Sequence, residues 1–194
     1  METAVANKKY TVAEYLAMEE RSVEKHEFYN GKIIKMPGAK PVHNLIAANL
    51  IIQLGIELEK KKTNYLVLTS DTKIHIARLN TFVYPDAVVI CEKIELYPGS
   101  EMVITNPLLI VEVLSPSTED YDRHGKFFDY KQIPSFKEYV LVEQDMPLVT
   151  ASYKIADRTW QDNIAEGINS SIHLQSIDCI ISLSKIYKGI QFDA

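Results

Sequence analysis

Two carboxylates interrupt apolar stretches in a way that suggests metal chemistry. Asp86 directly precedes the apolar run at residues 87–90, and Glu112 lies inside a second run at residues 108–114. A carboxylate in a buried strand is costly unless it is paired, hydrogen-bonded or bound to a cation. Either residue alone could be a strand-end group that reaches solvent. On neighbouring strands, both could bind one Mg²⁺, with the Val113 carbonyl as a further ligand, because Mg²⁺ prefers one or two carboxylates and other oxygens.

A lysine stands between two further polar side chains at helical spacing. Asp122, Lys126 and Tyr130 are four residues apart, so they share one face of a predicted helix. Asp122 and Lys126 could form only a surface ion pair, worth a few tenths of a kcal/mol. In the functional interpretation, Lys126 faces the carboxylates, where it orients a water that attacks a phosphodiester and offsets charge on phosphate oxygens.

Glu27 and His43 complete the set of candidate residues. Glu27 begins a predicted hairpin strand, and His43 lies in the first turn of a long predicted helix that starts at Pro41. A single histidine is more often structural than functional. At a helix N-terminus, however, it could contact a phosphate or a water.

The composition limits the classes of protein that this chain can represent. Its 194 residues are 46% hydrophobic, which favours one folded domain and excludes a disordered chain. No apolar stretch approaches the roughly 18 residues of a membrane helix, and the N-terminus does not resemble a signal peptide. We therefore expect a cytoplasmic protein with no membrane partner.

Charge and cysteine content narrow the choice further. The net charge of −5 argues against a protein that coats nucleic acid. A local basic groove could still bind a nucleic acid. Lys32, Lys35 and Lys40 are one cluster of lysines that could contribute. The two cysteines, Cys91 and Cys179, cannot form a disulfide scaffold or a four-ligand zinc site, and we expect both to be buried and reduced.

The elements that position the candidate residues follow from periodicity and turn signals. Thr11 and Glu14 have capping-box spacing, Asn30-Gly31 predicts a hairpin turn, and apolar residues recur every fourth position from Ile46 to Leu58. We predict helices at 11–21, 41–62 and 117–132, a hairpin at 27–36, strands at 65–68, 73–76, 82–91, 108–114 and 138–143, and short strands over 148–181. This order predicts an α/β (α+β) domain with a central mixed sheet flanked by helices.

Taken together, these segments resemble a known family. The chain is similar to the Uma2 family, also called DUF820, whose members are restriction-endonuclease-like proteins of the PD-(D/E)XK nuclease superfamily. The matching segments are residues 27–33 (Glu-Phe-Tyr-Asn-Gly-Lys-Ile), 84–89 (Tyr-Pro-Asp-Ala-Val-Val), 110–118 (Ile-Val-Glu-Val-Leu-Ser-Pro-Ser-Thr) and 138–142, with His43, Asp122, Lys126 and Tyr130. The resemblance covers roughly residues 10–145.

The resemblance implies a restriction-endonuclease-like core with a Mg²⁺- or Mn²⁺-dependent phosphodiesterase centre. Asp86 and Glu112 would match the metal carboxylates, and Glu27 the acidic residue of the N-terminal region. The family pattern places a lysine two positions after Glu112, where this chain has Leu114. Lys126 would take its place, with Lys131 as the weaker candidate.

These observations predict a single domain with a core at about 10–145 and a strand-rich C-terminal extension at about 146–194. We expect a metal-dependent endonuclease that acts on nucleic acid, with DNA as the substrate, and a homodimer. One alternative is an inactive nucleic-acid- or protein-binding module on the same fold. Another is an assembly module in which the strand-rich tail forms a dimer interface.

Overall fold

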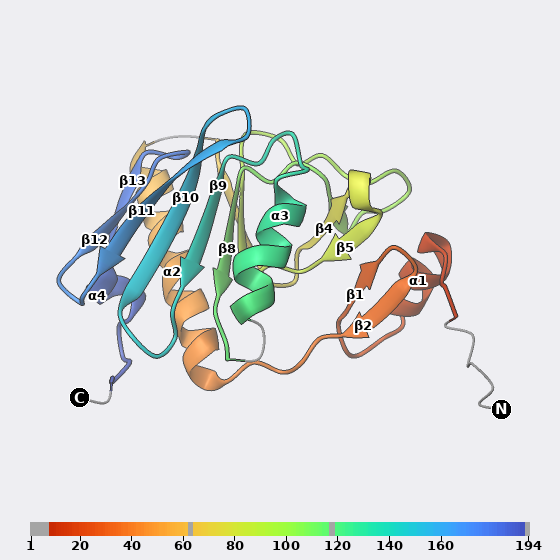
Figure 1. The fold of residues 1–194 in the computed structure, drawn as a ribbon, viewed down its shortest axis with the longest axis horizontal. Coiled ribbons are helices and arrows are strands. Elements are labelled where there is room, and N and C mark those ends of the chain that lie inside the picture. The colour runs from red at the N-terminus through yellow and green to blue at the C-terminus, as the bar shows by residue number, and fades with distance from the viewer. Residues whose placement is uncertain (1–7, 62–63, 117–118, 193–194) are drawn as a thin grey trace.

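A six-stranded mixed sheet with helices on both faces forms the centre of the fold (Figure 1). The computed structural model describes residues 8–61, 64–116 and 119–192. Among the described strands of this sheet, only the two middle ones, β8 and β9, pair in parallel. The strand order is β11 (Thr159–Glu166), β10 (Leu148–Ala156), β9 (Glu138–Val142), β8 (Leu109–Val113), β6 (Ala87–Ile90) and β3 (Leu66–Thr69).

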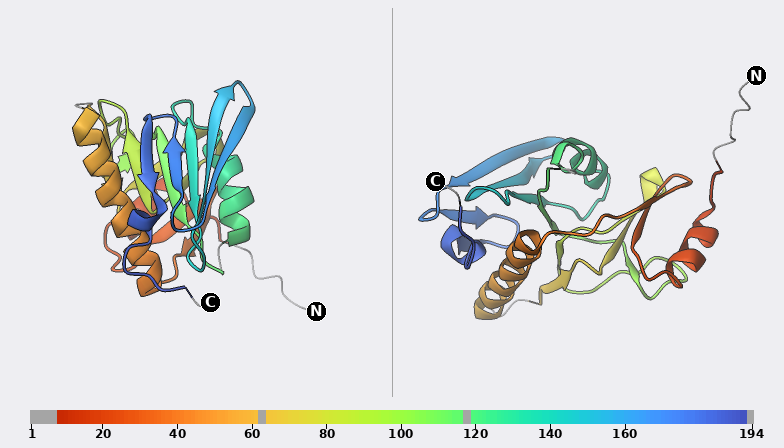
Figure 2. Two further views of the ribbon diagram at one scale, coloured as in Figure 1. Left: turned by 90° about the vertical axis from the view of Figure 1, so that its left-hand side faces the viewer. Right: turned by 90° about the horizontal axis from the view of Figure 1, so that it is seen from below.

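Alternation along β8 divides the core into two layers. Val111 and its neighbours at odd positions pack against the long helix α2 (Pro41–Lys61). Ile110 and Leu114 pack on the opposite face, beside the helical segment formed by η2 (Tyr121–Lys126), a π-helical turn, and α3 (Phe127–Tyr130). Figure 2 shows the two helices on opposite sides of the sheet. Glu112 shares the η2–α3 face because side chains two apart on a strand point the same way.

A second sheet carries the N-terminal part of the candidate site. Its order is β2 (Lys32–Lys35), β1 (His26–Tyr29), β5 (Thr81–Val83), β4 (Lys73–Ile76) and β7 (Val103–Ile104), and helix α1 (Val12–Glu19) packs against it. The predicted capping box of Thr11 and Glu14 is confirmed. The predicted hairpin is also confirmed, since Asn30 and Gly31 have φ values of 45° and 99°.

Several predicted elements differ from those in the structure. The strand predicted at 82–91 divides into β5 and β6. Pro85 cannot donate a backbone hydrogen bond, so it interrupts strand pairing and the chain changes direction before Asp86. The two-residue strand β7 and the 3₁₀ turn η1 (Ala77–Leu79) had no sequence signal. Ser117, the start of the helix predicted at 117–132, and Lys62, the end of the helix predicted at 41–62, lie outside the described residues. The prediction of two buried thiols is wrong for Cys91, which is exposed because β6 ends one residue earlier, whereas Cys179 is buried.

The residues after 146 are rich in strands, as predicted, and two of those strands lengthen the central sheet. β10 pairs with β9, and β11 forms the edge of the sheet. A separate hairpin of β12 (Ser171–Leu174) and β13 (Cys179–Ser182), followed by α4 (Leu183–Ile186), packs over the α2 side. This end of the molecule lies opposite to α1 and the N-terminal hairpin (Figure 1).

Helix α2 is long and apolar enough to cross a membrane by length and composition alone, with a mean hydropathy of 1.2 over 18 residues. Core helices of globular proteins pass the same test. Here Ile46, Leu50, Leu54 and Leu58 are buried in the core cluster beneath the sheet. The helix is therefore weak evidence for a membrane span.

We expect Glu138→Ala to lower the free energy of unfolding by about 2–3 kcal/mol, because this buried carboxylate joins β9 to the β12–β13 turn. It accepts hydrogen bonds from the Gln175 and Ser176 backbone N–H groups, both at 2.8 Å, and from the Ser176 hydroxyl at 2.6 Å. Urea unfolding measures the effect. The exposed control Glu166→Ala should change the free energy of unfolding by less than about 0.5 kcal/mol. Equal losses of stability in the two variants would contradict the structural role of Glu138.

Candidate active site

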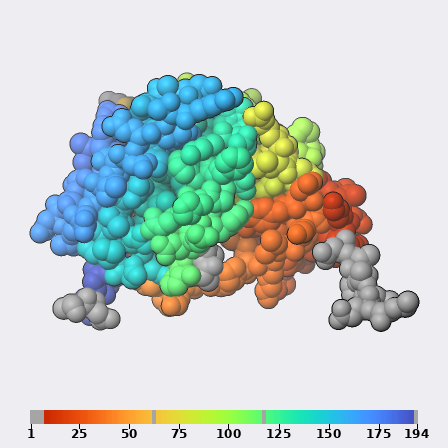
Figure 3. Space-filling view, in the orientation of Figure 1, coloured from red at the N-terminus to blue at the C-terminus, as the bar shows by residue number. Residues whose placement is uncertain are grey.

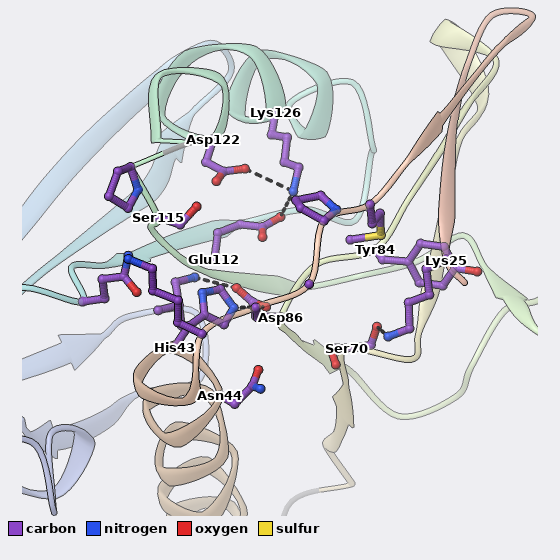
Figure 4. Close-up of a pocket in the computed structure, with 18 of the residues that line it drawn as sticks. Lys25, His43, Asn44, Ser70, Tyr84, Asp86, Glu112, Ser115, Asp122 and Lys126 are labelled. Carbon is purple, nitrogen blue, oxygen red and sulfur yellow. Dashed lines mark hydrogen bonds and ion pairs between the residues drawn. The ribbon is translucent and has the colours of Figure 1, made fainter. Parts of the chain in front are cut away.

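A cleft of about 720 Å³ opens where the carboxyl end of β8 meets the N-terminus of α2 and the helical segment η2. Figure 4 shows the side chains that converge there, and Figure 3 shows η2–α3 lying beside the chain that leads from β1 to α2. The cleft is lined by six of the predicted site residues, one of which is Val113. The other five are His43, Asp86, Glu112, Asp122 and Lys126.

Asp86 is held in place at both of its carboxylate oxygens. His43 Nε2 lies 2.9 Å from Oδ1, and the backbone N–H of Val113 donates to Oδ2 at 2.7 Å. The N–H and C=O of a strand residue point to the same side, so the Val113 carbonyl also faces the Asp86 side. Asp86, Val113 and the first turn of α2 therefore lie together in the structure.

Glu112 is buried and accepts two hydrogen bonds at one oxygen. Lys126 Nζ donates to Oε1 at 3.1 Å, and the Tyr130 hydroxyl donates to the same atom at 2.8 Å. Both donors come from the η2–α3 segment, which covers this face of the sheet. Lys126 and Tyr130 therefore both hold Oε1 and leave the other carboxylate oxygen, Oε2, unused by them.

Lys126 is surrounded by carboxylates. Besides Glu112, its Nζ lies 3.1 Å from Asp122 Oδ1 and 3.9 Å from Glu27 Oε1. The side chains of Lys126, Glu112 and Asp122 are only 9%, 4% and 3% exposed. Asp122 and Lys126, four residues apart on the helix, thus form a buried ion pair that faces the sheet. The alternative of a surface ion pair is wrong.

The charges in this cluster determine what Lys126 can do. Burial alone would lower the pKa of Lys126, but Glu112, Glu27 and Asp122 raise it well above its usual value. Lys126 is therefore an ammonium at neutral pH, which donates hydrogen bonds and does not accept a proton. Burial raises the pKa of Glu112 despite the neighbouring ammonium, and the charges of Asp122 and Asp86 raise it further.

Glu27 lies behind Lys126 and does not line the cleft. Its carboxylate accepts a hydrogen bond from the Tyr84 backbone N–H at 3.2 Å and another from the Tyr29 hydroxyl at 2.6 Å. Both of its oxygens are therefore already engaged. In this arrangement Glu27 orients Lys126 from the N-terminal sheet and does not itself face the cleft.

Lys131 is not brought to the cluster. Its Nζ lies 3.5 Å from the centroid of the Phe127 ring and 5.3 Å from that of Trp160, a cation–π arrangement. Lys131 follows Tyr130 by one residue, so it projects from a different side of the helix. The geometry therefore favours Lys126 over Lys131 as the lysine of the site.

The donor set fits a hard divalent cation. No group of three or more His, Cys, Asp or Glu side chains among the described residues could hold a metal unaided. Mg²⁺ does not need one, because it takes one or two carboxylates and keeps several waters. Asp86 and Glu112, with the Val113 carbonyl, would hold it. In addition, the buried Oε1 of Gln144 beside the cleft lacks a hydrogen-bond partner among the described residues, as expected where water belongs.

Several residues that line the cleft were not predicted from the sequence. Gln144 follows β9, and its position is visible only once β9 is known to pair with β8. Lys25 is not among the predicted residues, and Lys35 and Lys40 are predicted only as members of a lysine cluster. The three lysines share one signal in the sequence, which is that they flank the hairpin and the start of α2. These two elements fold back over the end of the sheet.

Comparison with known proteins identifies the family. A family model described as "Uma2: Putative restriction endonuclease" matches residues 12–178. The chain belongs to the Uma2 family. The resemblance stated from residues 10–145 is therefore confirmed and extends through most of the strand-rich C-terminal part.

Two relatives of the chain come from Synechocystis sp. (strain ATCC 27184 / PCC 6803 / Kazusa). One, named "Uncharacterized protein sll1609", is 38% identical over 172 residues, which cover 89% of this chain and 96% of the relative. The other, "Uncharacterized protein slr1290", is 34% identical over 184 residues, which cover 95% and 94%.

A solved structure supports the fold of this Uma2 protein. It is the crystal structure of a putative nuclease belonging to DUF820 from Anabaena variabilis ATCC 29413. The TM-score is 0.72 at 14% sequence identity, with 92% of this chain and 97% of that chain covered. The likeness shows the fold, and the predicted restriction-endonuclease-like architecture is confirmed.

We expect Lys126→Met, measured in EDTA, to lower the free energy of unfolding by about 3–5 kcal/mol, because it leaves buried carboxylates without their cation. The control is Lys61→Met, which removes a lysine from the more exposed pair with Asp178 and should cost less than about 1 kcal/mol. Chemical denaturation measures both. Equal stability of the two variants would contradict the buried ion pair described here.

Proposed function

We propose that this protein is a Mg²⁺- or Mn²⁺-dependent endonuclease that hydrolyses phosphodiester bonds, with DNA as its substrate. The observation that carries the proposal is the meeting of Asp86 and Glu112, from adjacent strands, with the buried ammonium of Lys126 in one cleft. The membership in Uma2, a family described as putative restriction endonucleases, supports the same reaction class.

Each residue has a task that its contacts support. A cation held by Asp86 and Glu112 would supply Lewis acidity and lower the pKa of a bound water. Lys126 donates hydrogen bonds to the attacking water or to a phosphate oxygen, where negative charge develops. His43 and the Val113 N–H orient Asp86, while Tyr130 orients Glu112.

Lysines at the rim of the cleft support a polyanionic substrate. Lys25, Lys35 and Lys40 line the same cavity as the carboxylates. Lys25 and Lys35 pair with the exposed acids Asp71 and Glu24, whereas Lys40 has no ion pair within the described chain. Such lysines can bind phosphates flanking the scissile bond even though the protein as a whole is acidic.

A second candidate function is a binding module that retains the carboxylates without cutting. The observation that favours it is Leu114, which occupies the usual lysine position and is buried in the core on the η2–α3 side. Lys126 would then serve only to neutralise the buried carboxylates. Retained cation and DNA binding without cleavage would support this candidate.

We expect the wild type to nick supercoiled plasmid in Mg²⁺ and to lose this activity in EDTA. Asp86→Asn, Glu112→Gln and Lys126→Met should each lower the rate by at least about 100-fold, because each removes a charge used at the reacting centre. Glu95→Gln, an exposed residue outside the cleft, is the matched control and should leave the rate unchanged.

The result that contradicts the enzyme proposal is nicking that persists equally in the Asp86→Asn and Glu112→Gln variants. Such activity would belong to a contaminant or to a different site. Circular dichroism on each variant separates loss of activity from loss of folding.

A further inference from the structure

Gln144 is a neutral polar residue of the cleft that the proposed chemistry does not yet use. Its Oε1 atom is buried and has no hydrogen-bond partner among the residues that the structure describes. Asp122 Oδ1 is the other such atom, but it lies 3.1 Å from the Lys126 ammonium. Gln144 has no comparable charge partner. Buried polar atoms are nearly always hydrogen-bonded, so this oxygen indicates a partner such as an ordered water.

The fold brings Gln144 to the carboxyl end of the strand that carries Glu112. β8 and β9 are parallel, and Glu112 pairs in register with Leu141. The N–H of Leu114 donates to the Val142 carbonyl at 2.8 Å, which holds the two strand ends together. Gln144 follows two residues later and lines the cleft together with Glu112.

The residue before Gln144, Glu143, is held by contacts with two elements, the strand β10 and the helical segment η2. The N–H of Glu143 donates to the Leu148 carbonyl at 3.0 Å, and the Arg123 guanidinium of η2 forms an ion pair with the Glu143 carboxylate. Gln144 is therefore held at the cleft by the sheet and by the helix that also carries Lys126.

Water in this cleft needs an acceptor for its protons. Lys126 can only donate hydrogen bonds, and a cation polarises its bound waters so that they become strong donors. Asp86 and Glu112 Oε1 already accept hydrogen bonds within the protein. The Gln144 carboxamide can accept one without adding to the negative charge of the cluster.

We propose that Gln144 is a positioning residue that holds a water of the cation's hydration shell by accepting its hydrogen bond at Oε1. This rests on the proposed function, because it presupposes a divalent cation on Asp86 and Glu112. Outer groups of this kind hold the ligands of a metal site in place, and their loss weakens binding about 10- to 100-fold.

The test is calorimetric titration with Mn²⁺ on Gln144→Met, a substitution of similar size that cannot accept this hydrogen bond. We expect Mn²⁺ affinity to fall about tenfold. The unfolding midpoint in EDTA should stay equal or rise, because the substitution removes a buried oxygen that makes no bond in the protein.

Two further variants isolate the hydrogen bond. Gln144→Glu keeps an acceptor oxygen at the same position and should retain or tighten Mn²⁺ binding. Gln161→Met makes the same chemical change at an exposed position of β11 and should leave both measurements unchanged.

Wild-type Mn²⁺ affinity in Gln144→Met would overturn this role while leaving the proposed function intact. A clear loss of stability in EDTA would also overturn it, since it would show a structural role. If the wild type itself bound no Mn²⁺, the metal-dependent proposal would fail and the role of Gln144 would fail with it.

Discussion

The burial of one ammonium among several carboxylates is the constraint on which the site depends. Glu27, Glu112 and Asp122 lie within 4 Å of Lys126, and the charge of Asp86 also acts on Glu112. One positive charge cannot offset all of these negative charges in a poorly hydrated place. The cluster is therefore suited to a divalent cation, which would supply the missing charge and hold the water and phosphate of the proposed reaction.

The rest of the fold serves to bring these groups together. Glu112 comes from the central strand β8, Lys126 from the helix over one face, and His43 from the start of α2 on the other face. The N-terminal sheet contributes Glu27, whose two oxygens are held by Tyr84 and Tyr29. Four parts of the chain that are distant in sequence thus meet at one end of a single sheet.

Asp86, Glu112 and Lys126 were predictable because each has a local signal: a carboxylate in an apolar run, or a lysine one helical turn from an acid. The part played by Glu27 was not, because Tyr84 reaches it only through the pairing of β1 with the distant strand β5, although Tyr29 is just two residues away. Lys126 could be ranked above Lys131 from the sequence, and the ring contacts of Lys131 with Phe127 and Trp160 agree with that ranking. Gln144 has no sequence signal, since only the parallel pairing of β8 with β9 places it beside the cleft.

Anomalous diffraction from crystals soaked in Mn²⁺ would show directly whether Asp86 and Glu112 hold one cation. We expect one strong peak in contact with carboxylate oxygens of Asp86 and Glu112, at roughly 2.0–2.2 Å, as expected for a small oxygen-bound cation. We also expect the peak to be lost in Glu112→Gln crystals. An ordered, solvent-accessible cleft with no peak, or a peak only at surface carboxylates elsewhere, would rule out a cation held by these two residues.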